Sequence, residues 1–96
     1  MELLLGCGSK KDKRIVVPGR PQQWTGLTTV DIVAGHNPDV LHDLNLTPWP
    51  FADNRFSEVH AYELLEHLGR QGDYAAFFAT FYEIWRVLEP GGILCA

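Results

Sequence analysis

The feature that most constrains the fold is the run Leu3–Ser9, LLLGCGS, near the start of the sequence. An apolar segment suited to a buried strand leads directly into two glycines, Gly6 and Gly8. Glycine has no Cβ and tolerates positive φ, so the chain can turn sharply there and bring its amides close to a ligand. Such turns also occur as plain loop geometry, so a ligand-binding interpretation needs support from other motifs.

Composition indicates one folded domain. Of the 96 residues, 46% are hydrophobic and 21% are charged, which is ordinary for a globular protein. The net charge of −4 argues against a nucleic-acid surface built from bulk charge. No apolar run approaches the roughly 18 residues of a membrane helix, and Leu3–Leu5 is too short for a signal peptide. We therefore expect a cytoplasmic protein with no membrane partner.

Basic residues are concentrated just after the glycine turn. Five of the eight lie within eleven positions, and these are Lys10, Lys11, Lys13, Arg14 and Arg20. Two interpretations are open: a solvated loop, which is the common case for such a run, or a rim that attracts an anionic substrate.

Strand and helix signals alternate along the chain, which predicts a parallel sheet. The expected strands are Glu2–Cys7, Thr28–Val33, Asp39–His42, Ser57–Ala61 and Ile93–Ala96. Pro18 and Pro21 argue against a long helix between the first two strands. Leu44–Phe56 is rich in turn-forming residues and is expected to be a loop.

Two helices are expected after the fourth strand. The first covers Tyr62–Leu68, and the second begins after the N-cap candidate Asp73. In the second helix, apolar residues recur at steps of three and four, at Tyr74, Phe77, Phe78, Phe81, Ile84, Trp85 and Leu88. This spacing predicts that the aromatic stripe packs against the sheet. Pro90-Gly91-Gly92 is expected to end the helix and lead into the last strand.

Cys7 and Cys95 are expected to be free thiols. They fall in strands that the sheet proposed below places two positions apart, and neighbouring strands are about 4.8 Å apart. Their Cα atoms would then be about 10 Å apart, beyond the roughly 7 Å that a disulfide can span.

Six motifs follow one another along the chain: LLLGCG, VDI, HDL, TPWPFADNRF, YELLEHL and RVLEPGG. In this order they resemble the class I S-adenosylmethionine-dependent methyltransferases over the whole chain, most specifically in RVLEPGG and LEHL. The resemblance implies a Rossmann-like, doubly wound α/β sheet with strand order 3-2-1-4-5 and a shortened or absent first helix. Complete domains of that family have seven strands. We therefore expect residues 1–96 to be a single, truncated cofactor-binding domain without strands six and seven.

The resemblance also implies a binding site for S-adenosyl-L-methionine. The implied contacts are Gly6, Cys7, Gly8, Ser9, Asp31, Ile32, Asp43, Leu44, Ala61 and Tyr62. Asp31 would accept the ribose hydroxyls, since a carboxylate offers two oxygens, and Asp43 would lie near the adenine amino group. Alternatively, both aspartates cap turns after strands. Leu4 and Lys10 depart from the family pattern, in which an acidic residue and a third glycine are common at these positions.

Glu63, Glu66 and His67 stand at positions i, i+3 and i+4 and would share one helix face. Such a group suits Mg²⁺ or Mn²⁺ when further oxygen ligands are available, with His60 as a possible second histidine. Relatives that use no metal also carry LEHL, and we expect no metal here. If the methyl acceptor holds a proton, His60, Glu63 and His67 are the candidate catalytic bases.

The expected reaction is methyl transfer, in which the protein aligns the acceptor and excludes water. HAYE stands after the fourth strand in place of an N-P-P-Y type tetrapeptide, which favours a small-molecule, sugar-linked or lipid-linked acceptor over nucleic acid. The alternative is a catalytically silent fragment or binding module. A nicotinamide-dependent dehydrogenase is disfavoured because Lys11 stands where G-x-G-x-x-G has its third glycine. An exposed edge on the fifth strand would favour a homo-oligomer.

Overall fold

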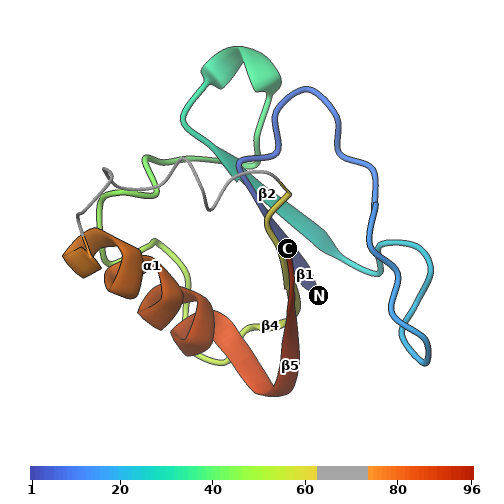
Figure 1. The fold of residues 1–96 in the computed structure, drawn as a ribbon. Coiled ribbons are helices and arrows are strands. Elements are labelled where there is room, and N and C mark those ends of the chain that lie inside the picture. The colour runs from blue at the N-terminus through green and yellow to red at the C-terminus, as the bar shows by residue number, and fades with distance from the viewer. Residues whose placement is uncertain (63–73) are drawn as a thin grey trace.

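Five parallel strands in the order β3-β2-β1-β4-β5 form the centre of the protein (Figure 1). The computed structural model describes residues 1–62 and 74–96. The strands are β1 Glu2–Leu5, β2 Leu27–Asp31, β3 Val40–Leu41, β4 Phe56–His60 and β5 Leu88–Cys95. A 3₁₀ turn, η1, covers Ala34–His36, and the helix α1 covers Tyr74–Val87. This arrangement confirms the predicted Rossmann-like α/β fold and its strand order.

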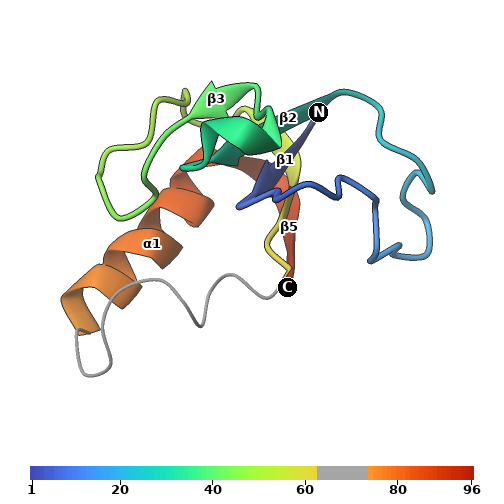
Figure 2. The ribbon, with the colours of Figure 1, turned by 90° about the horizontal axis from the view of Figure 1, so that it is seen from above.

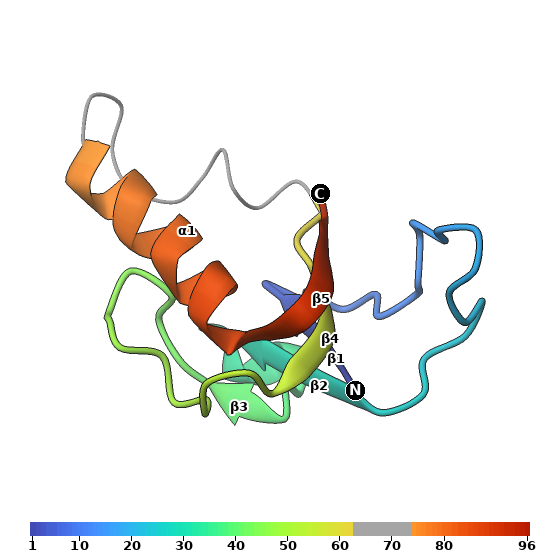
Figure 3. The ribbon, with the colours of Figure 1, turned by 90° about the horizontal axis from the view of Figure 1, so that it is seen from below.

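No helix lies between β1 and β2, as the two prolines predicted. From Lys11 to Pro18 the side chains instead alternate between partly buried and exposed, with the period of two expected of an extended chain. We call Lys10–Arg20 the strap. Figures 1 and 3 show the strap and α1 on opposite sides of the sheet.

The two faces of the sheet differ in chemistry. On the α1 side, Leu3, Val30 and Val59 belong to a buried apolar cluster that includes Ile84 and Val87 of the helix. Strand side chains alternate, so the other face takes the intervening positions. These include the buried polar residues Glu2, Thr29, Glu58 and His60. The strap therefore lies against a polar surface, which sets what its own side chains must satisfy.

The boundary between α1 and β5 differs from the expectation. Pro90-Gly91-Gly92 does not separate the two elements, because β5 begins at Leu88 directly after the helix. The register shifts between the Phe56–Leu88 and Glu58–Ile93 pairs, which places the Pro-Gly-Gly segment in an irregularity within the strand. Gly91 has a φ of 81°, and a Cβ at Gly92 would lie only 2.9 Å from the Glu89 carbonyl oxygen. Glycines thus allow a bulge to form there.

The expected packing of the aromatic stripe is wrong for much of α1. Ile84 is buried and Phe81 packs against the core, but Phe77, Phe78 and Trp85 are exposed. The predicted stripe extends around too much of the helix for all its members to face one sheet.

No helix in the described part of the chain is both long and apolar enough to span a bilayer.

The remaining local expectations are met where the structure describes them. The four other strands and the long helix lie within two residues of their predicted bounds. Cys7 and Cys95 are free and buried, as the predicted strand spacing required. The short helix expected over Tyr62–Leu68, apart from Tyr62, and the N-cap candidate Asp73 lie outside the described residues.

Candidate functional site

The carboxyl ends of the parallel strands meet at one edge of the sheet, where open α/β folds bind their ligands. The glycine turn follows β1 there, and Asp31 is the last residue of β2. Figure 2 shows η1 beside the chain that leaves β1. Gly6 and Gly8 have φ values of 57° and 59°, in the left-handed region that favours glycine. A Cβ on Gly8 would meet nothing within 4 Å, so the turn is open on that side.

The carboxylate of Asp31 holds this turn closed. Its Oδ2 accepts a hydrogen bond from the Gly8 amide at 2.8 Å and lies 3.1 Å from Nδ1 of His36. Its Oδ1 accepts one from the Val33 amide at 3.0 Å. Burial raises the pKa of Asp31, but hydrogen bonds from Val33, Gly8 and His36 outweigh it, so the pKa lies below its ordinary value. Asp31 is therefore ionised and fixed in place at neutral pH.

A hollow of about 130 Å³ opens beside Asp31. It is lined by Gly6, Asp31, Ile32, His42, Asp43, Leu44 and Asn45. Ile32 is 61% exposed and supplies an apolar wall. Sites for whole small ligands usually measure about 300–1,000 Å³, so this hollow suits one end of a larger ligand. Five of the lining residues are cofactor contacts implied by the sequence, namely Gly6, Asp31, Ile32, Asp43 and Leu44.

Asp43 also caps a turn after a strand, as the alternative interpretation of the sequence predicted. Its Oδ1 accepts hydrogen bonds from the Asn45 amide at 2.9 Å and from the Asn45 side chain at 3.2 Å. This contact fixes the turn after β3 and so shapes the wall of the hollow. A turn-capping role and a place beside the ligand are thus compatible at Asp43.

Tyr62, just after β4, connects this edge with the strap. Its hydroxyl accepts hydrogen bonds from the Arg14 and Ile15 amides at 3.0 and 3.2 Å. The same oxygen lies 2.6 Å from Nδ1 of His60. The strap is therefore anchored on an implied cofactor contact, while Ala61, the residue before it, is buried.

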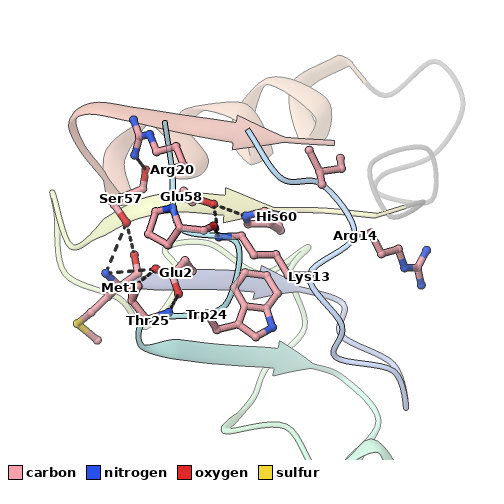
Figure 4. Close-up of polar contacts among 12 residues, drawn as sticks. Met1, Glu2, Lys13, Arg14, Arg20, Trp24, Thr25, Ser57, Glu58 and His60 are labelled. Atoms are coloured by element: carbon pink, nitrogen blue, oxygen red, sulfur yellow. Dashed lines mark hydrogen bonds and ion pairs between the residues drawn. The ribbon is translucent and has the colours of Figure 1, made fainter. Parts of the chain in front are cut away.

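From Tyr62 the network continues to the buried polar side chains of His60, Glu58 and Lys13, which Figure 4 shows. Nε2 of His60 lies 2.7 Å from Oε1 of Glu58, and Nζ of Lys13 lies 3.3 Å from the same oxygen. An ionised Glu58 only accepts, so we assign the proton of His60 to Nε2, and Nδ1 then accepts from the Tyr62 hydroxyl. His60 is fully buried with both nitrogens engaged. Its predicted role as a catalytic base stays a prediction, and it reaches the edge only through Tyr62.

Glu58, His60 and Cys95 also form the one group of possible metal ligands within the residues that the structure describes. Their ligand atoms lie within 4.8 Å of one another. The ammonium of Lys13 already provides the positive charge there, and a metal ion would have to displace it. Burial, followed by the charge of Glu58, raises the pKa of the Cys95 thiol, which disfavours the thiolate that binds metals. These residues fit an ion-pair network better than a metal centre. Glu63, Glu66 and His67 lie outside the described residues.

Three of the five basic residues after the glycine turn make contacts within the protein, and the other two are exposed. Lys13 is buried against Glu58, the ammonium of Lys11 donates to the Asn37 carbonyl at 2.7 Å, and Arg20 donates to the Gly91 carbonyl at 2.7 Å. Lys13 is therefore removed from solvent, while Lys11 and Arg20 bind backbone carbonyls in exposed contacts. Lys10 and Arg14 are exposed.

Sequence reasoning missed two histidines at the site. His36 reaches Asp31 from η1, and His42 lines the hollow while its Nε2 lies 2.8 Å from the Leu46 carbonyl oxygen. The signal for His36 was its place five residues after Asp31, within a turn that Asn37 ends in the left-handed conformation. Short polar turns of this type are hard to place from sequence because their direction depends on the packing around them.

The fold defines a Rossmann-like α/β domain, and the hollow beside β1 and β2 is its candidate ligand site. Residues 3–96 match the family model described as "Methyltransferase domain", and the chain belongs to this family. No curated protein and no solved structure matches the chain.

Proposed function

We propose that the chain binds S-adenosyl-L-methionine at the carboxyl edge of the sheet and transfers its methyl group to a small-molecule, sugar-linked or lipid-linked acceptor. The observation that carries the proposal is Asp31. This buried, ionised carboxylate is bonded to the amide of Gly8 and forms the wall of a hollow that also exposes Ile32. A carboxylate that accepts hydrogen bonds, beside an apolar surface, suits a ribose joined to a flat base.

The donor set fits this ligand. At Asp31, Oδ2 is engaged by the Gly8 amide, by His36 and, at 3.9 Å, by the Cys7 thiol, while Oδ1 accepts from the Val33 amide at 3.0 Å. A ribose hydroxyl would therefore bind at Oδ1, the less crowded of the two oxygens. The side chain of Ile32 would pack against the base. The open turn at Gly6–Gly8 would admit the amino-acid end of the cofactor close to the backbone. When bound, the cofactor supplies a methyl group activated on a sulfonium.

Around the methyl group, the chain's own residues would position the acceptor. Tyr62 lies at the end of β4 and is held by His60 and the strap. Its hydroxyl oxygen has both lone pairs engaged by strap amides, so Tyr62 fits the role of a wall better than that of a base in this arrangement. If the acceptor loses a proton, His60, Glu63 and His67 remain the candidate bases, and His60 would act through the Tyr62 hydroxyl.

Calorimetry with S-adenosylhomocysteine tests the proposal. We expect micromolar binding to the wild-type chain and at least about tenfold weaker binding to Asp31→Ala, which loses a charged hydrogen-bond acceptor. Asp53→Ala is the matched control. Asp53 lies in the loop before β4, and its exposed carboxylate pairs with Arg86 of α1. NAD is the control ligand and should not compete.

Absence of binding to a chain that circular dichroism shows to be folded would contradict the proposal, as would equal affinity in Asp31→Ala. Binding without methyl transfer to any acceptor would instead favour the alternative of a catalytically silent binding module.

A further inference from the structure

The outer side of α1 carries large aromatic side chains in contact with solvent. Phe77, Phe78, Tyr82 and Trp85 are 45%, 66%, 57% and 70% exposed. Their rings lie close in pairs, with centroids 5.8 Å apart for Phe77–Phe78 and for Tyr82–Trp85. We call these four side chains the aromatic face. A soluble helix normally turns charged or polar residues outward, so a face of this composition calls for a partner surface.

The aromatic face is neither part of the core nor part of the site. The core contacts of α1 come from Phe81, Ile84 and Val87. Arg86 bonds Asp53 and the Phe51 carbonyl in the loop before β4. The candidate cofactor site lies at the carboxyl ends of β1 and β2 and includes no residue of α1. The exposed rings therefore line no part of the hollow beside Asp31.

A hollow adjoins the aromatic face at the foot of the helix. It measures about 330 Å³, and Trp85 lines it together with Asn54 and residues 88–92 of β5. Projecting rings next to a hollow make a surface that can complement a copy of itself, because a twofold axis sets the rings of each copy against the hollow of the other.

The size of the face agrees with a pair of such surfaces. An aromatic side chain buries about 150–250 Å², so at the exposures above the four rings leave about 500 Å² of apolar surface per copy. Two copies would bury about 1,000 Å² in total, the lower limit for a specific interface. The four side chains are uncharged, so bringing two faces together opposes no like charges within them.

We propose that the aromatic face is the interface of a symmetric homodimer of this chain. The edge of β5, where the sequence suggested that copies would pair, has a smaller part. Pro90 has no N–H group to donate, and the Gly91 carbonyl already accepts a hydrogen bond from Arg20. The first half of the strand is thus poorly suited to pairing, and the helix provides most of the contact.

Sedimentation equilibrium of the full chain, without any ligand, tests the dimer separately from the methyltransferase proposal. We expect a monomer–dimer equilibrium with a micromolar dissociation constant. Trp85→Ser and Tyr82→Ser should each weaken it at least about tenfold, as removal of an aromatic hot spot does. Val16→Ser is the matched control, since Val16 is a 44% exposed side chain of the strap, on the opposite side of the sheet from α1 (Figure 1), and it should leave the dimer unchanged.

The proposal is overturned if the wild-type chain is monomeric at hundreds of micromolar, because the face would then await a different partner. It is also overturned if Val16→Ser weakens association as much as the two α1 variants do. Both α1 variants change exposed side chains, so circular dichroism should show them folded, and Phe78→Ser replaces either one that is not.

Discussion

The buried pair of Lys13 and Glu58 provides the sharpest test of how the strap is held. Their side chains are only 3% and 2% exposed, and the ammonium and carboxylate lie 3.3 Å apart. In Lys13→Met the aliphatic stem remains but the charge is lost, so Glu58 keeps the hydrogen bond from His60 and loses its counter-ion. In Lys13→Met/Glu58→Gln neither charge is buried, and the amide oxygen at position 58 can still accept from His60.

The expected magnitudes follow from this geometry. Removing one partner of a buried ion pair costs about 3–5 kcal/mol, and the remaining bond from His60 places Lys13→Met near about 3 kcal/mol. A domain of this size has a total stability of about 5–15 kcal/mol, so the single variant should lose a large fraction of it. The double variant should lie within about 1 kcal/mol of the wild type, because replacing both charges removes the desolvation cost together with the attraction.

Urea unfolding of the wild type, both single variants and the double variant measures the coupling between the two positions. We expect the sum of the two single-variant losses in unfolding free energy to exceed the loss in the double variant by at least about 2 kcal/mol. Additive losses, or a loss below about 0.5 kcal/mol in Lys13→Met, would show that the pair contributes no more than an exposed ion pair does.

Two further predictions concern α1 and the start of β5. The hydrogen bond from Arg86, opposed by burial, holds the pKa of Glu83 below its ordinary value. The contribution of Glu83 to stability is therefore complete above about pH 5 and is lost as the pH falls through the folded-state pKa. Urea unfolding at neutral and acid pH should show that the unfolding free energy of Glu83→Gln depends less on pH than that of the wild type, and an equal dependence would contradict this prediction. Gly92→Ala should lower the unfolding free energy by about 1–3 kcal/mol, because its Cβ would lie 2.9 Å from the Glu89 carbonyl oxygen; a thermal midpoint equal to the wild type would count against the close packing of the bulge.

The topology could be predicted because each local signal pointed to the same answer. The apolar run of β1, the positive φ required at Gly6 and the alternation of strands and helices lead to one parallel sheet. The place of Asp31 followed as well, since the carboxyl ends of parallel strands meet at one edge. Its partner His36 did not follow, because only the packed turn of η1 brings that side chain back to the carboxylate.

Where prediction failed, the periodicity was real but its direction was not fixed. The spacing of Phe77 to Leu88 shows which residues share a side of α1, but the sheet takes Ile84 and Val87 and leaves Phe78 and Trp85 outside. The strap raises a similar difficulty. The sequence suggested a solvated loop or an anion-attracting rim for its basic residues and not a buried ion pair, because the acidic partner of Lys13 lies 45 positions later, on the buried face of β4. Long-range pairs of this kind have no local signature.

We propose above that a ligand resembling S-adenosylmethionine binds beside β1 and β2. A titration of the ¹⁵N-labelled chain with S-adenosylhomocysteine, followed by amide chemical shifts, locates the binding site residue by residue. We expect the largest changes at Gly6, Gly8, Ile32 and Leu44, and unchanged amide shifts around Trp85 of α1. Changes centred on α1, or no changes in a folded chain at saturating ligand, would contradict it.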